Sequence, residues 1–142
     1  MAEINRAKAK TIITRALKLG REKEMKPLAV IVVDAGGHPI AFEREDGAPA
    51  GRFLIAEGKA HGAVMMGIGG YALRERAEAQ AYFIGALTDV YGGKLVPVPG
   101  GVLVRDKRGR LIGAVGVTGD TSENDAEAAV AGIEAAGFIA EA

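Results

Sequence analysis

The feature that most constrains the fold is a glycine-rich tract made of two β-branched runs, residues 97–104 and 110–120. The polar residues 106–109 between the runs are typical of a turn, so the tract predicts a β-hairpin. Glycine inside or at the end of a strand indicates a positive φ, a bulge, or the close approach of another backbone or of a ligand. Because these glycines lie at strand ends, the tract is also a candidate wall of a binding pocket.

A second hairpin is predicted earlier in the chain. Residues 28–34 are almost entirely apolar, which indicates a central strand with no face in solvent. The turn 35–39 joins this strand to residues 40–44, which alternate between polar and apolar as a partner strand does.

The remaining segments are mostly helical in pattern. Helices are predicted over residues 3–25, 50–66, 71–80 and a last segment that starts at Thr121 or Ser122 and stops at Gly137. Residues 82–91 are compatible with a helix or with a loop over a site. Gly58 and Gly62 are spaced so that another backbone can approach their helix closely. Hairpins exclude a doubly wound parallel sheet, so we predict one α+β domain over residues 1–142, an antiparallel sheet of about five strands with helices packed on it.

The composition excludes several classes of protein. Eighteen Lys and Arg balance 18 Asp and Glu, whereas a nucleic-acid-binding protein normally carries a basic excess or stripe. The chain has no cysteine, so disulfides, thiolate nucleophiles and Cys-ligated metals are ruled out. No apolar run approaches the roughly 18 residues of a membrane span, and the first residues lack the apolar core of a signal peptide. We therefore expect a cytoplasmic protein without nucleic-acid or membrane partners.

His61 is the strongest single candidate for a catalytic or ligand-binding residue. A histidine here is compatible with a general base, a haem ligand or a metal ligand. Glu57 lies four residues before it and Met65 four after, on one helix face, so Glu57 is placed to orient the imidazole. This stripe cannot supply both axial ligands of one haem, because those ligands approach from opposite faces. The alternative is a helix histidine that is hydrogen-bonded at a subunit contact.

Further candidate ligand-binding residues lie at strand ends. The guanidinium of Arg44 suits a carboxylate or a haem propionate. Asp46 either joins that site or closes a turn. Gly100 and Gly101 can present backbone N–H groups to an anion, or they form a tight strand entry after Pro99. The tract lacks the Gly-Lys-Ser/Thr of a P-loop.

Three charged residues remain as candidates with structural alternatives. Asp120 and Glu123 offer carboxylates for acid–base catalysis, and the dipole of the last helix also explains acids at its start. Lys59 is a candidate ligand-binding residue or an ion-pair partner. With His38 and His61 as the two histidines and no cysteine, we predict no metal site.

Residues 33–48 resemble the signature VDAGG-x-x-x-A-x-x-R-x-DGA of the GlcG/HbpS family, also called the haem-degrading or DUF336 domain. The same domain occurs at the C-terminus of some PduO cobalamin adenosyltransferases. The resemblance continues at the Lys59–Ala60 pair, at residues 98–102 and 112–119, and at residues 125–132. It covers nearly the whole chain, although His61 stands where most relatives have Thr, Tyr or another residue.

The resemblance implies a profilin-like or PAS-like domain that assembles into a homo-oligomer and, in some members, binds haem or cobalamin. We therefore expect an oligomeric small-molecule-binding protein, with haem or another tetrapyrrole as the leading ligand class and the cofactor itself left open.

Two other functions stay open. One is a cofactor-independent tautomerase, isomerase or hydrolase that acts on a small organic acid, with His61 as base and with Arg44 and the Gly100–Gly101 amides binding the carboxylate. The other is an accessory or assembly protein without a ligand.

Overall fold

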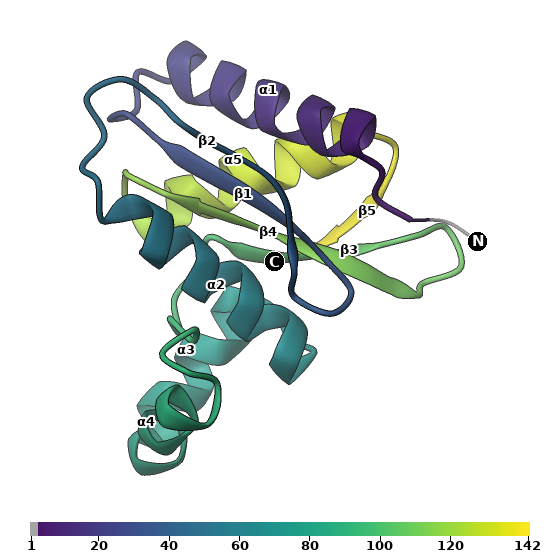
Figure 1. Ribbon diagram of the computed structural model, residues 1–142. Coiled ribbons are helices and arrows are strands. Elements are labelled where there is room, and N and C mark those ends of the chain that lie inside the picture. The colour runs from purple at the N-terminus through teal and green to yellow at the C-terminus, as the bar shows by residue number, and fades with distance from the viewer. Residues whose placement is uncertain (1–2) are drawn as a thin grey trace.

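The computed structural model of the chain describes residues 3–142, which form one antiparallel sheet with helices on both faces (Figure 1). The elements are α1 (Arg6–Glu22), β1 (Ala29–Asp34), β2 (Pro39–Arg44), α2 (Arg52–Met66), α3 (Gly70–Ala79), α4 (Ala81–Val90), β3 (Gly101–Arg105), β4 (Leu111–Thr118), α5 (Ser122–Ala135) and β5 (Ile139–Glu141). The strand order is β2-β1-β4-β3-β5, and every neighbouring pair is antiparallel. The predicted α+β fold is confirmed.

The observed helices and strands differ from the predicted ones, or decide between alternatives, at three places. The uncertain segment 82–91 is helical and forms α4. α1 is shorter than the predicted 3–25 at both ends. The Asn5 side chain accepts the amide hydrogen of Lys8 and caps the start of the helix, and at the other end Glu24 has a φ of +54° that a helix cannot continue through. The fifth strand follows the last helix: β5 is three residues long and pairs with β3, which is too short for a sequence pattern to mark.

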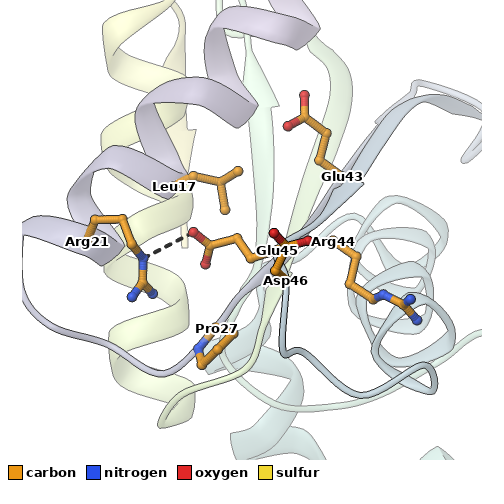
Figure 2. Close-up of a pocket in the computed structure, with 7 residues that line it drawn as sticks. All are labelled: Leu17, Arg21, Pro27, Glu43, Arg44, Glu45 and Asp46. Atoms are coloured by element: carbon orange, nitrogen blue, oxygen red, sulfur yellow. Dashed lines mark ion pairs between the residues drawn. The ribbon is translucent and has the colours of Figure 1, made fainter.

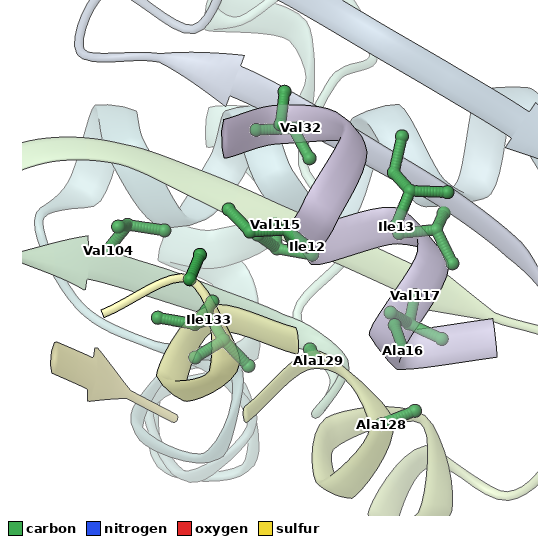
Figure 3. Packing of buried hydrophobic residues seen from close by; sticks show 14 of the residues in the cluster. Ile12, Ile13, Ala16, Val32, Val104, Val115, Val117, Ala128, Ala129 and Ile133 are labelled. Carbon is green, nitrogen blue, oxygen red and sulfur yellow. The ribbon is translucent and has the colours of Figure 1, made fainter. Parts of the chain in front are cut away.

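The two faces of the sheet have separate cores. α1 and α5 cover one face, and Figure 3 shows Ile12 and Ile133 packed with the sheet residue Val115 there. α2 covers the other face, where Ile31 and Val33 of β1 are buried. β1 is therefore apolar on both sides, as its continuous run of branched residues indicated.

α2 lies directly on two glycines of the glycine-rich tract. Gly101 and Gly116 oppose each other across β3 and β4. A Cβ on Gly116 would overlap the Ala56 carbonyl, and one on Gly101 would overlap the Lys59 carbonyl. The close approach that these glycines indicated is thus made by the backbone of α2.

The outer side of α2 is crossed by residues 94–96, which we call the strap. The Val96 amide donates to the Gly58 carbonyl at 3.1 Å. A Cβ on Gly62 would stand 3.2 Å from the Cα of Leu95. The predicted backbone approach at this glycine pair is therefore confirmed. Leu95 also joins Leu73 of α3 and Ile84 of α4 in a small third core.

A buried ion pair ties α2 to the start of α5. The Lys59 Nζ donates to Asp125 Oδ2 at 3.1 Å and to the Val117 carbonyl at 3.0 Å. The two side chains are 3% and 2% exposed. Asp125 Oδ1 accepts the amide hydrogen of Asp120 at 2.9 Å. Burial lowers the pKa of Lys59 and raises the pKa of Asp125, while each partner's charge opposes that effect on the other.

Among residues 3–142, no helix is both long enough and apolar enough to cross a membrane.

We predict that Gly116→Ala lowers the free energy of unfolding by roughly 1–3 kcal/mol, because the added methyl must displace the α2 backbone. Gly51→Ala is the matched control. No atom lies within 4 Å of a Cβ at this position, and its φ of −66° suits any residue, so the free energy of unfolding should change by less than about 1 kcal/mol. Urea unfolding measures both; equal stability of the two variants would contradict the close approach at Gly116.

We also predict that Lys59→Met lowers the free energy of unfolding by about 3–5 kcal/mol, because it leaves Asp125 buried without its cation. A double-mutant cycle with Asp125→Asn should show that the double variant loses less than the sum of the single variants. Without Lys59, the pKa of Asp125 in the folded chain lies further above its unfolded value. The destabilisation by Lys59→Met should therefore shrink as the pH falls. Strict additivity in the cycle would show that the pair is not coupled.

Candidate ligand-binding site

His61 projects from the flank of α2 that faces the β1–β2 turn. The turn contains Gly37 at φ +80°. A Cβ there would lie 2.8 Å from His61 Cδ2, 3.5 Å from its Nε2 and 3.3 Å from Met65 Cε. Gly37 is therefore needed both for the turn and for the space that the His61 ring occupies.

A backbone carbonyl determines which His61 nitrogen is available to a ligand. His61 Nδ1 lies 3.0 Å from the carbonyl oxygen of Lys94. Since a carbonyl only accepts, Nδ1 of the neutral ring carries the hydrogen and donates it. Nε2 then holds the lone pair, which is the tautomer in which a histidine can bind a metal or accept a proton.

Glu57, one turn before His61, is a buried carboxylate with an incomplete set of partners. The residue is 8% exposed. Its nearest cation is the Lys94 ammonium, 3.9 Å from Oε2, and the Lys94 side chain is 49% exposed. That distance is beyond a hydrogen bond. Glu57 and His61 thus lie side by side on one helix flank, as their spacing predicted.

Lys94 connects these two residues, and the sequence reasoning missed it. Its carbonyl holds His61, and its ammonium faces Glu57. Tyr91 stands beside them, with its ring centre 6.2 Å from that of His61. The signal was the Gly92–Gly93 pair, where both residues have positive φ and turn the chain from the end of α4 into the strap.

Arg44 and Asp46 line a different hollow, of about 410 Å³, between α1 and the end of β2 (Figure 2). There Arg21 Nε and Glu45 Oε2 form an ion pair at 3.1 Å, and Glu45 Oε1 accepts the Leu28 amide at 2.7 Å. Figure 2 shows the Arg44 side chain directed away from that ion pair. Arg44 is two residues from Phe42 on β2, and Phe42 packs in the core under α2, so the Arg44 side chain leaves the strand on that same face of the sheet.

The predicted acid–base residues lie elsewhere. The Lys26 amide, the Asn124 side chain and the Thr121 amide donate to Asp120 and lower its pKa to about 2. Asp120 is therefore an ionised acceptor at the start of α5. Glu123 pairs with Arg74 at 2.8 Å, and this hydrogen bond lowers the pKa of Glu123.

The catalytic prediction for His61, Asp120 and Glu123 stays a prediction. Within residues 3–142, no hydrogen bond or ion pair joins His61 to either acid.

The remaining predicted ligand-binding residues, Lys59, Gly100 and Gly101, lie together where α2 packs on the sheet. Gly100 has φ +116°, and a Cβ there would lie 2.8 Å from Lys59 Nζ. Gly101 is buried under the Lys59 backbone. These residues are brought together with each other rather than with Arg44 or His61, and their part in ligand binding also stays a prediction.

The second histidine lies outside the α2 flank. His38 is exposed, and its Nδ1 is 3.3 Å from Asp34. In the part of the chain that the structure describes, no three His, Cys, Asp or Glu side chains gather in a way that could hold a metal ion.

Three solved structures are similar to this chain over most of its length, and one of them is a haem complex. PduOC in complex with haem is 26% identical, with a TM-score of 0.86 over 96% of this chain and 97% of that chain. A double mutant of Streptomyces reticuli HbpS is 26% identical, with a TM-score of 0.81 over 94% of this chain and 87% of that one. Klebsiella pneumoniae protein ORFY, of the DUF336 family, is 25% identical, with a TM-score of 0.84 over 96% and 93%. No curated protein matches the sequence.

The family model described as "Haem degrading protein HbpS-like" matches residues 4–134. The resemblance seen in the VDAGG hairpin and the glycine-rich tract is thereby confirmed. This chain belongs to the HbpS-like family.

Proposed function

We propose that this protein binds haem or a closely related tetrapyrrole, with His61 Nε2 as the iron ligand. The observation that carries the proposal is the 3.0 Å contact between His61 Nδ1 and the Lys94 carbonyl. Histidines that bind metals commonly donate their other ring N–H to a carbonyl or carboxylate, which orients the ring and raises its basicity. The family and the haem complex of PduOC, 26% identical, support the same ligand class.

The surroundings of His61 fit such a ligand. Met65 and Tyr91 provide apolar and aromatic surface beside the ring. The half-exposed Lys94 ammonium is placed to attract a propionate. Bound haem would supply a redox-active iron, while these residues would bind, orient and partly shield the ring system.

We predict that haemin produces a saturable shift of its Soret band with the wild-type protein and with His38→Ala. His38→Ala is the matched control, because it removes the other, exposed histidine. His61→Ala should weaken haemin binding on the order of tenfold or more, and added imidazole should restore the band position. Absence of a saturable shift in the wild type would overturn the proposal, and an unaltered shift in His61→Ala would remove His61 as ligand.

We further propose that the protein forms a homo-oligomer through the outer face of α4. Tyr82 and Val90 on this helix are 79% and 68% exposed. The exposed residues between them, Gly85 and Ala86, are small enough for another helix to come close. Asp89 is the one charged residue of α4 and is itself exposed next to Val90, so a second α4 that packs here meets a mainly apolar face with a single carboxylate near its end.

We predict that the mass of the wild-type protein in solution exceeds the 14.7 kDa of one chain. The Val90→Asp variant should shift this mass toward that of the monomer. Leu54→Asp is the control, because Leu54 on α2 is equally exposed at 68% but lies on another helix. Sedimentation velocity decides between the outcomes. A monomeric wild type would refute the homo-oligomer, and equal effects of the two substitutions would refute the α4 interface.

A further inference from the structure

A second hollow, of about 540 Å³, lies at the end of the sheet beside the β1–β2 and β3–β4 turns. We call it the sheet-end hollow; it is lined by residues 3–4, 34–36, 38, 40 and 110–112. The two turns are neighbours because β1 and β4 pair, with Asp34 opposite Gly113. Figure 1 shows the segment before α1 at the same end as the β3–β4 turn. The volume is that of a typical small-molecule site.

One wall of the sheet-end hollow is apolar. Ile4 and Ile112 are 6% and 9% exposed, and Ile40 is half-buried. All three pack with the core that lies between the sheet and the helices α1 and α5. The apolar body of a small ligand can therefore bury its surface against side chains that the core already holds in place.

The rim of the hollow carries a cation that is fixed in position and keeps free donors. Arg110 Nε donates to Asp106 Oδ2 at 2.7 Å, and Asp106 is 3% exposed. Asp106 Oδ1 accepts the amide hydrogens of Arg108 and Arg110 at 2.9 Å each, which fixes the turn around this carboxylate. Among residues 3–142, no hydrogen bond engages the Nη atoms of Arg110. A guanidinium held in this way suits the two oxygens of a carboxylate.

His38 lies at the same rim, on the β1–β2 turn. A Cβ on Gly36 would lie 2.8 Å from His38 Cε1, so Gly36 leaves room for this ring as Gly37 does for the ring of His61. His38 Nδ1 faces Asp34 at 3.3 Å. A protonated imidazole donates through both nitrogens, so His38 can present Nε2–H to an anion while Nδ1 faces Asp34.

Two carboxylates also line the hollow, and they decide which charge a ligand should carry. Asp34 Oδ1 accepts the amide hydrogens of Gly36 and His38 at 2.9 Å each, so its own turn stabilises its charge. Glu3 is exposed, and water and salt screen its charge. The groups with donors to spare are therefore Arg110 and His38, and their complement is an anion.

We propose that the sheet-end hollow binds small carboxylates with an apolar body. Arg110 binds the carboxylate, His38 supplies a second donor, and the isoleucine wall packs against the body. His61 does not line this hollow, so the proposal is independent of haem binding at the α2 flank.

Isothermal titration calorimetry with 4-phenylbutyrate, 4-phenylbutanamide and 4-phenylbutylamine tests the proposal, because these ligands share a phenylalkyl body and differ in the charge of the end group. The wild type should bind the carboxylate about tenfold more tightly than the amide, and the amine most weakly. Arg110→Met should abolish this preference and leave amide binding unchanged, which also shows that the hollow is intact. Arg110→Lys keeps the charge without the planar fork, so its preference should lie between those of Arg110→Met and the wild type.

Two further variants separate contact from long-range charge. Arg108→Met is the matched control: Arg108 is an exposed residue of the same turn that does not line the hollow, so the carboxylate affinity should change by less than about twofold. Ile40→Ala removes part of the apolar wall and should weaken the carboxylate and the amide by the same factor, about three- to tenfold.

Several outcomes would overturn the proposal. These are no saturable binding of 4-phenylbutyrate, equal affinity for the three ligands, tighter binding of the amine, or equal losses in Arg110→Met and Arg108→Met. His61→Ala should bind 4-phenylbutyrate as the wild type does, and a loss there would place the ligand at the α2 flank instead. A wild type that binds haemin but not 4-phenylbutyrate would refute this site alone and leave the proposed function standing.

Discussion

The contact between α2 and the glycine pair of β3 and β4 is the constraint on which the rest of the structure depends. Gly101 and Gly116 face each other across the two strands, and both lie against backbone carbonyls of α2. At these two glycines no side chain fits between the helix and the strands, so a larger residue at either position would push α2 away from the sheet. The buried pair of Lys59 and Asp125 then ties the same helix to α5.

The position of the candidate site follows from this contact. The face of α2 toward the sheet is occupied by packing, and its outer side is crossed by the strap at Gly58 and Gly62. The flank toward the β1–β2 turn is what remains for polar residues. Glu57 and His61 lie there, and the strap brings Lys94 to both. A rigid helix and a short covering segment therefore hold the groups that would meet a ligand.

Local pattern predicted much of this architecture. The buried β1, both hairpins and the start of α5 follow from residue type and spacing. At that start the Thr121 hydroxyl accepts the Asn124 amide hydrogen and caps the helix, and strand alternation, turn residues and capping are all local effects. The close approach at Gly58 and Gly62 was also visible, since a four-residue glycine spacing indicates a neighbouring backbone. β5 was not placed, because a three-residue strand depends on pairing with β3 rather than on its own residues.

The sequence by itself determined the fold class, the family and the pairing of Glu57 with His61 on one helix face, because each of these rests on residues that are near in the chain. Only the tertiary structure decided which of the predicted site residues lie in contact with one another. It placed Lys59, Gly100 and Gly101 together under α2, Arg44 and Asp46 beside another hollow, and Lys94 at His61. These contacts join segments that are distant in sequence. The glycines indicated that another backbone comes close, but only the packed structure shows which segment it is.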